Sequence, residues 1–263
     1  MLSDATRKEI AAKLIECLQE KKQIGLLTKD YPEIEVEDSY RIQEFIIDSF
    51  KQQGDAVKGY KIGLTSKVMQ EMVGTHEPDF ATMTDRMFEL EASTLQYADW
   101  IAPHVEVEVA FVMKDELRGP KVNAADVIRA TDFILPSIEL VDLRVAMAPG
   151  MDVRDTIADL AAVGAVVLGG NPVRLDDVDV RQIGGQLIIN DEVKEEGMSS
   201  AVLGNPVNAV VWLVNKLSEF GVGFKPGDVI LSGSFVRALP VSPGDRVVAR
   251  FDNGLGDVAI DFA

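Results

Sequence analysis

The sequence contains a single cysteine, Cys17, and only two histidines, His76 and His104, among 263 residues. One cysteine excludes an intramolecular disulfide and makes a reducing compartment the default expectation. Two histidines exclude a zinc site built from several imidazoles and leave little material for a Ser-His-Asp triad. Any chemistry of this chain therefore depends mainly on other side chains.

Basic residues are also scarce. The 26 lysines and arginines are outnumbered by 43 aspartates and glutamates, which gives a formal net charge of −17. This balance argues against nucleic acid or an anionic membrane as a partner, because both need a basic footprint. No apolar run is long enough to span a membrane. The first residues are polar and lack the apolar core of a signal peptide, so we expect a cytoplasmic protein.

Regular alternation of strands and helices is missing as well. Apolar residues recur at helical spacing over 10–18 and 42–50, with Ser3 or Asp4 as the first cap and Asp38 or Ser39 as the second. We therefore expect an N-terminal helical segment over residues 1–56. A third helix is expected to begin at Asn205 and Pro206.

The remainder, residues 57–263, reads as a β-rich catalytic domain. A short helix is expected near 66–72, and Asn190-Asp191 is typical of a hairpin turn. The expected strands cover 57–64, 105–113, 134–141, 165–168, 186–190, 229–232, 246–251 and 258–262. This order favours a mixed α+β fold over a doubly wound sheet.

Two glutamates occupy alternate positions in the run His-Val-Glu-Val-Glu-Val-Ala-Phe at 104–111. In a strand, Glu106 and Glu108 project from one face and the valines from the other. Burying two like charges without a cation between them would cost several kcal/mol. The pattern therefore indicates either a site for a hard divalent ion, Mg²⁺ or Mn²⁺, or a solvated strand face.

A third acid, Glu139, lies in the apolar stretch Leu-Pro-Ser-Ile-Glu-Leu-Val-Asp at 135–142. A glutamate in such a strand needs a partner. Arg144 or Arg129 could neutralise it, or it could complete an oxygen-rich metal site with the first two glutamates. Lys61, between glycines in a predicted strand, is either a surface lysine or a contact for an anionic substrate.

Several short motifs occur together in a specific order. They include Gly-Tyr-Lys-Ile-Gly-Leu-Thr-Ser at 59–66, Val-Glu-Val-Glu-Val-Ala-Phe at 105–111 and Ser-Gly-Ser-Phe-Val-Arg at 232–237. Others lie at 77–80, 129–132, 135–142, 155–159 and 167–170. From about residue 30 to the end, the chain resembles the 2-oxo-4-enoate hydratases and 4-oxalocrotonate decarboxylases of the fumarylacetoacetate hydrolase superfamily.

This resemblance implies a fumarylacetoacetate-hydrolase-like β-sandwich roll with an N-terminal helical segment. It implies a Mg²⁺ or Mn²⁺ site at Glu106, Glu108 and Glu139, and a homo-oligomer. It further implies a substrate that is a 2-oxo or 2-hydroxy-dienoic acid from aromatic ring cleavage, and possible association with a companion decarboxylase or hydratase.

The reaction is chosen on one position. In the hydratases the residue after the Glu-Pro pair is aspartate, whereas in the decarboxylases this position is commonly apolar. In this chain the position is Asp79. An acid there could deprotonate or position water, so we expect a hydro-lyase that makes a 4-hydroxy-2-oxo acid, with Asp79 as base and Lys61 assisting. The stretch 233–237 resembles the 2-oxohept-4-ene-1,7-dioate subgroup. We accordingly assign substrate binding to Ser234, Arg237 and Leu64, with Arg237 pairing with a distal carboxylate.

One residue departs from the family pattern: Leu160 follows Asp159 where asparagine is usual. Its effect on substrate preference is left open. Three alternatives also stay open. The first is decarboxylation on the same scaffold, the second is hydrolysis of an acylpyruvate with His104 activating water, and the third is a non-enzymatic partner that stabilises a companion enzyme.

Overall fold

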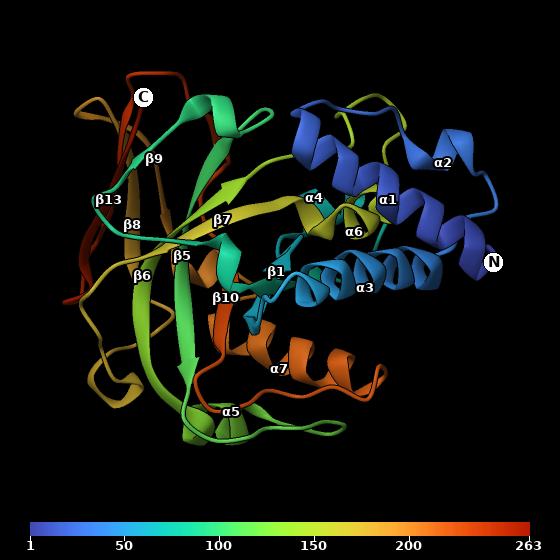
Figure 1. Ribbon diagram of the computed structural model, residues 1–263. Coiled ribbons are helices and arrows are strands. Elements are labelled where there is room, and N and C mark those ends of the chain that lie inside the picture. The colour runs from blue at the N-terminus through green and yellow to red at the C-terminus, as the bar shows by residue number, and fades with distance from the viewer.

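The computed structural model describes all residues, 1–263, as two packed β-sheets flanked on one side by helices (Figure 1). The larger sheet has the strand order β2-β1-β10-β5-β6-β7-β3, with β11 paired to β5. Its strands are β1 (Val57–Gly63), β2 (Asp79–Thr84), β3 (Phe88–Glu89), β5 (His104–Met113), β6 (Thr131–Val141), β7 (Val163–Leu168), β10 (Val229–Ser234) and β11 (Leu239–Pro240).

The smaller sheet has the order β4-β13-β12-β8-β9. Its strands are β4 (Thr94–Leu95), β8 (Gly184–Ile189), β9 (Glu192–Met198), β12 (Arg246–Phe251) and β13 (Gly256–Phe262). Asn190 and Asp191 both have positive φ in the β8–β9 turn, which confirms the predicted hairpin. The mixed, β-rich α+β class is confirmed.

The N-terminal helices lie over the face of the larger sheet that is turned away from the smaller sheet, whereas the helices over 124–130 and 206–218 pack against its other face (Figure 1). They are α1 (Asp4–Glu20), α2 (Leu27–Asp30), α3 (Val36–Gln52), α4 (Lys67–Met72), α5 (Ala124–Ala130), α6 (Val153–Ala158) and α7 (Pro206–Ser218). Ser3 caps α1, and Asn205 with Pro206 begins α7, as predicted. No helix combines the length and the apolar character that crossing a membrane would require.

The predicted cap of the second long helix is wrong. Helix α3 begins one turn earlier, with Glu35 as its N-cap. Asp38 instead accepts hydrogen bonds from the Glu35 and Leu2 amides and pairs with Arg7. An acid at the third helical position of a capping box is the same type of residue as an N-cap. The sequence therefore could not tell which of the two positions Asp38 occupies.

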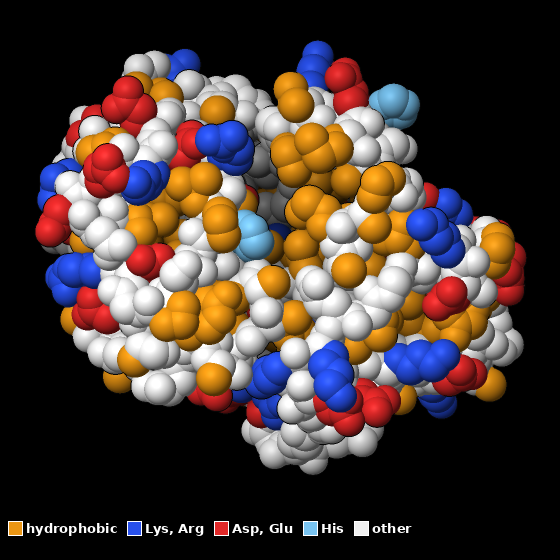
Figure 2. All heavy atoms as spheres, turned by 90° about the horizontal axis from the view of Figure 1, so that it is seen from above, with side chains coloured by type: hydrophobic (Ala, Val, Ile, Leu, Met, Phe, Trp, Pro, Cys, Tyr) orange, Lys and Arg blue, Asp and Glu red, His pale blue; other side chains and the backbone are white.

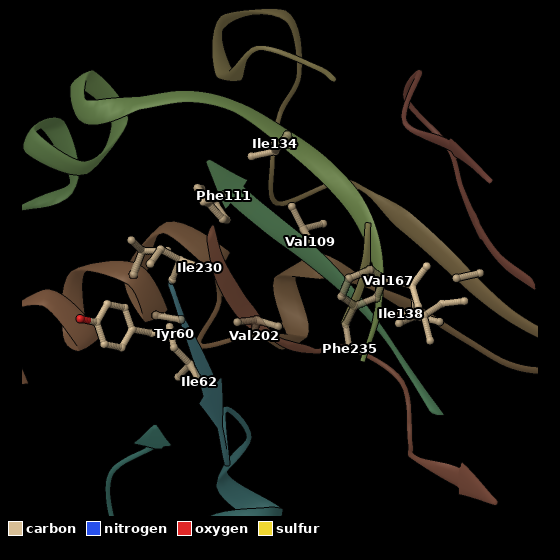
Figure 3. Close-up of a cluster of buried hydrophobic side chains, with 14 of the residues drawn as sticks. Tyr60, Ile62, Val109, Phe111, Ile134, Ile138, Val167, Val202, Ile230 and Phe235 are labelled. Carbon is tan, nitrogen blue, oxygen red and sulfur yellow. The ribbon is translucent and has the colours of Figure 1, made fainter. Parts of the chain in front are cut away.

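Two apolar cores lie on opposite faces of the larger sheet. Alternate residues of its strands, such as Tyr60, Ile62, Val109 and Ile138, enter the core shared with the smaller sheet (Figure 3). Ala110 and the other strand residues that point to the opposite face pack instead against α1 and α3 in a second cluster. Since successive strand residues face opposite ways, the neighbours of the first group are turned toward the helical side.

Several short elements within the β-rich region were not predicted, among them β2 and α6. Strand β2 lies in a stretch expected to be irregular, and helix α6 lies between strands. Both are too short to show a clear period. The N-terminal helices pack directly on the sheet, and the division into residues 1–56 and 57–263 stays a prediction.

Candidate active site

Three glutamates converge on the helical face of the larger sheet. Glu106 and Glu108 are alternate residues of β5, and the β5–β6 register places Glu139 directly opposite Glu106. One carboxylate oxygen from each of the three lies within 4.8 Å of the other two. The sequence pattern therefore identified side chains that the fold does bring together.

These carboxylates are removed from water. Glu108 and Glu139 are buried, and Glu106 is half-buried. Desolvation, and after it repulsion from Glu139, raises the pKa of Glu106 to about 8. Desolvation and the other two glutamates also raise the pKa of Glu108 well above its ordinary value. The cluster thus holds carboxyl groups that resist ionisation unless a cation is near.

The partners expected for Glu139 in the alternative reading are engaged elsewhere. Arg144 pairs with Asp159, and Arg129 pairs with Asp126. Lys61 on β1 is the cation that approaches Glu139, with its Nζ 3.1 Å from Oε1, but neither carboxylate oxygen of Glu139 accepts a hydrogen bond. A single ammonium cannot neutralise three carboxylates, so this donor set fits an added divalent cation.

A bulge in β10 orients Glu108. The β5–β10 register shifts between Leu231 and Ser234, and within this bulge the Gly233 amide donates a 2.8 Å hydrogen bond to Glu108 Oε2. Gly233 has φ +106°, and a Cβ there would lie 2.5 Å from the Thr65 side chain. Both facts require glycine at this position.

Asp79 and Lys61 lie beside this cluster on neighbouring strands. Asp79 pairs with Gly63 in the β1–β2 ladder, and its side chain is buried. A Cβ on Gly63 would lie 2.3 Å from Asp79 Oδ1 and 3.5 Å from Lys61 Nζ. Asp79 Oδ1 and Lys61 Nζ therefore both lie next to the position that a side chain of residue 63 would take, which is called here the space at Gly63.

The two groups carry shifted proton affinities. Burial raises the pKa of Asp79, although Lys61 and a hydrogen bond from Thr156 oppose this effect. Burial disfavours the charged form of Lys61, but the carboxylates of Glu139, Asp79 and Glu106 outweigh it and raise the pKa of Lys61. Lys61 therefore stays an ammonium group, while Asp79 is a carboxyl group that ionises less readily than usual.

The three predicted substrate contacts have different surroundings. Ser234 is opposite Glu108 in the ladder, but its Oγ donates toward the carbonyls of Val107 and Val236. Leu64 has φ +55° and packs against the main core. The Arg237 side chain is 77% exposed and pairs with Glu195 on β9, so the structure does not bring it to the carboxylates. These three roles stay predictions.

Sequence reasoning missed Thr156 on α6, whose Oγ1 lies 3.1 Å from Asp79 Oδ2. A signal was present, because Asp152 and Asp155 have the spacing of a capping box and mark the start of this helix. His104, the proposed water activator of the hydrolase alternative, has its Nδ1 2.9 Å from the carbonyl oxygen of Ala102.

The departure at Leu160 falls in an unusual turn. Leu160, Ala161 and Ala162 all have positive φ, a region that asparagine tolerates better than leucine. The turn is held by Asp159, which pairs with buried Arg144 and accepts its amide at 2.8 Å. The Leu160 side chain is buried in the cluster under α1 and α3. This burial offsets the cost of the positive φ, which leucine adopts less readily than asparagine.

On one face of the molecule a hollow opens between the helical part and the sheet part. Figure 2 shows it from above, with hydrophobic side chains gathered along its rim. Exposed Val68, Met69 and Met72 of α4 and exposed Met147 contribute large hydrophobic side chains to the surface of this protein. The glutamates lie on the sheet face turned toward the helical side.

Comparisons with known proteins show the family and the fold. Residues 65–262 match the family model described as fumarylacetoacetate (FAA) hydrolase C-terminal. The chain belongs to the fumarylacetoacetate hydrolase family. It is 38% identical to the 2-oxo-hept-4-ene-1,7-dioate hydratase of Escherichia coli, over 100% of both chains. It is 39% identical to the 2-hydroxyhexa-2,4-dienoate hydratase of Comamonas testosteroni, over 95% of each.

Among solved structures of the family, the 4-oxalocrotonate decarboxylase from Pseudomonas putida G7, complexed with magnesium and adipate, superposes with a TM-score of 0.96. It is 31% identical, and the match covers 100% of this chain and 99% of that one. Membership in the family and its fold, both expected from the motifs, are confirmed.

Proposed function

We propose that this protein is a metal-dependent hydratase that adds water to a 2-oxo or 2-hydroxy-dienoate and forms a 4-hydroxy-2-oxo acid. The observation that carries the proposal is the buried convergence of Glu106, Glu108 and Glu139 beside Asp79 and Lys61. The full-length similarity to named hydratases supports the same reaction class and a substrate from aromatic ring-cleavage catabolism.

The three glutamates would hold Mg²⁺ or Mn²⁺. Their fit rests on hard oxygen donors, on the two oxygens of Glu139 that accept no hydrogen bond, and on raised carboxyl pKa values that a cation would reverse. The magnesium and calcium complexes of the related decarboxylase support a divalent ion. When bound, the ion supplies Lewis-acid stabilisation of negative charge on the 2-oxygen of the substrate.

Asp79 would act as the general base. The substrate dienol ketonises to an enone that is electrophilic at C4, and water then gives its hydroxyl to C4 and a proton to C3. Asp79 Oδ1 has no hydrogen-bond partner, so it is the oxygen free to take the proton of water as the C4–O bond forms. Because burial raises its pKa, Asp79 binds a proton more strongly than an exposed carboxylate would.

Lys61 would hold the charges in place. As an ammonium group it lies against Glu139 Oε1 and faces Asp79 across the space at Gly63. It therefore stabilises the ionised form of Asp79 before reaction and offers a donor to an anionic substrate. This role requires no proton transfer from Lys61.

Decarboxylation is the second candidate, and the match to the 4-oxalocrotonate decarboxylase fold over the whole chain favours it. A sequence relative of that name from Pseudomonas putida is 34% identical. The two reactions differ in what they need: hydration uses a base near water, whereas loss of CO₂ does not. Buried Asp79, with a free oxygen, favours hydration.

One assay separates these candidates. The protein is incubated with Mg²⁺ or Mn²⁺ and either 2-hydroxypenta-2,4-dienoate or 2-hydroxymuconate, while dienol absorbance and CO₂ are followed. We expect loss of absorbance, a 4-hydroxy-2-oxo product and no CO₂. Asp79→Asn should lower turnover by about 100-fold or more. Release of CO₂ that survives this substitution would identify the protein as a decarboxylase.

The metal site is tested by Glu106→Gln and Glu108→Gln, with Glu33→Gln on the exposed surface as a matched control. Both site variants should lose metal affinity and turnover, and the control should keep them. A homo-oligomer and a companion enzyme are further proposals, to be measured by light scattering of the protein alone and with its partner. A protein that keeps its partner but never turns over would be a stabilising subunit.

A further inference from the structure

Asp79 is held by a set of hydrogen bonds that begins in the N-terminal helices. Its Oδ2 contacts Thr156 Oγ1 at 3.1 Å, and the same hydroxyl lies 3.0 Å from the carbonyl oxygen of Val153. A threonine hydroxyl has one proton, and a carbonyl can only accept. An ionised Asp79 therefore competes for this proton and wins it, because hydrogen bonds to a charged acceptor are stronger.

The two oxygens of Asp79 thus have different surroundings. Oδ2 is occupied by Thr156, whereas Oδ1 is buried, has no partner and faces the space at Gly63 that Lys61 also borders. A proton taken up by Asp79 goes to the free oxygen.

A buried amide sets the distance between β2 and α6. Gln43 on α3 donates through Nε2 to the carbonyls of Phe80 and Ile157, both at 3.0 Å, and its Oε1 accepts from the Thr82 amide at 3.2 Å. Phe80 directly follows Asp79, and Ile157 directly follows Thr156. Gln43 therefore links the backbone adjacent to Asp79 with the backbone adjacent to Thr156.

Other contacts fix α6 from the same side. Thr28 on α2 donates from its amide and its hydroxyl to Asp155, at 3.0 and 2.8 Å, and Ser39 on α3 donates to the Arg154 carbonyl at 2.8 Å. Residues 1–56 lie outside the part of the chain that matches the family model, 65–262. The contacts that fix α6 thus come from a helical segment that the family model does not cover.

We propose that Gln43 and Thr156 are positioning residues that clamp Asp79, so that Oδ2 stays fixed and Oδ1 alone exchanges the proton of the reacting water. This inference rests on the proposed hydration and deepens it. Neither residue touches the reacting atoms. In the catalytic cycle Oδ1 takes a proton from water as the C4–O bond forms, and the proton ends on C3 of the product.

The side-chain types support this assignment. The two backbone carbonyls need hydrogen-bond donors, and the backbone amide needs an acceptor. The side-chain amide of glutamine supplies both, with two N–H donors and one oxygen. Glutamate would set carboxylate oxygens against two carbonyls, and asparagine is one methylene shorter. The charged and titratable groups that face Asp79 from other elements are Lys61 on β1, Glu139 on β6 and Tyr40 on α3.

The first test removes the hydroxyl alone. Thr156→Val keeps the shape of the side chain, and Thr156→Ser keeps the hydroxyl. The Asp79 carboxyl is titrated by infrared difference spectroscopy, with Asp79→Asn to assign its band. Without its donor, the pKa of Asp79 should rise by about one to two units, which shifts the acid limb of kcat/KM to higher pH. We expect kcat to fall about 10- to 100-fold with little change in KM, and Thr156→Ser to restore both.

The second test removes the clamp and has a matched control. Asn215 on α7 makes the same three kinds of bond elsewhere, with Nδ2 donating to the Val122 and Val211 carbonyls and Oδ1 accepting from the Val122 amide. Gln43→Leu and Asn215→Leu should both lower Tm. Only Gln43→Leu should reduce kcat, by about 10-fold or more, because displacement of a catalytic group by an ångström is costly. Mn²⁺ affinity should be unchanged in both.

Two results would overturn the proposal. One is a Thr156→Val protein whose Asp79 titration matches that of the parent. The other is a Gln43→Leu protein that loses no more activity than Asn215→Leu. If the parent protein hydrates no dienoate, the proposed function fails, while the infrared titration of Asp79 still decides whether Thr156 controls it. If Gln43→Leu does not fold, the two Thr156 variants decide the question.

Discussion

Binding of a divalent cation should release protons from the glutamate cluster. In the metal-free protein the pKa of Glu106 is raised to about 8, first by desolvation and then by Glu139. At pH 7 this group is about 90% protonated, and a bound cation needs it as a carboxylate. Binding at pH 7 should therefore release about one proton from Glu106, with a further contribution from Glu108, whose pKa is also raised.

The sign of the pH dependence follows directly. Because protons compete with the metal, apparent Mn²⁺ affinity should rise at least about tenfold per pH unit up to pH 8, above which the contribution of Glu106 levels off. Calorimetric titration in two buffers with different ionisation enthalpies measures the protons released. Glu106→Gln should lose the release assigned to Glu106, and Glu33→Gln should keep it. Affinity that stays flat from pH 6 to 8, with no proton release, would refute the description of this cluster.

The same shift acts on stability. A carboxyl group whose folded pKa is raised favours the protonated folded state, so metal-free protein should lose stability as the pH rises from Glu106's ordinary value, 4.5, to about 8. The loss is on the order of a few kcal/mol, with no further loss from this group above pH 8. Added Mg²⁺ should reverse it, as measured by Tm against pH with and without metal.

Two further outcomes are expected. Gly63→Ala places a Cβ 2.3 Å from Asp79 Oδ1, so the flexible acid should move, turnover should fall about 10- to 100-fold and the fold should persist; Gly25→Ala, with nothing within 4 Å of its Cβ, is the control and should keep full activity. Equal activity in the two variants would contradict the role of the space at Gly63. Asp159→Asn leaves buried Arg144 without its counter-charge and should lower the free energy of unfolding by about 3–5 kcal/mol in urea titration. A loss below about 1 kcal/mol would show that other contacts hold the turn.

Local patterns predicted much of the fold. The apolar periods of α1, α3 and α7, the caps Ser3 and Asn205, and the hairpin at Asn190 are set by interactions within a few residues, so they can be read along the chain. Strand β2 and helix α6 were missed because six residues carry too little periodicity to be distinguished from loops. Strand β2 carries Asp79, and helix α6 carries its hydrogen-bond partner Thr156.

The sequence by itself determined that Glu106 and Glu108 share one face of a strand and that Glu139 needs a partner. Alternation in a strand fixes Glu106 and Glu108 on one face, and an acid inside the apolar β6 needs a partner wherever the strand pairs. Only the tertiary structure decided that Glu139 lies opposite Glu106, that Arg237 pairs with Glu195, and that Gln43 joins β2 to α6. Strand register and long-range hydrogen bonds depend on segments distant in the chain, and no local period encodes them.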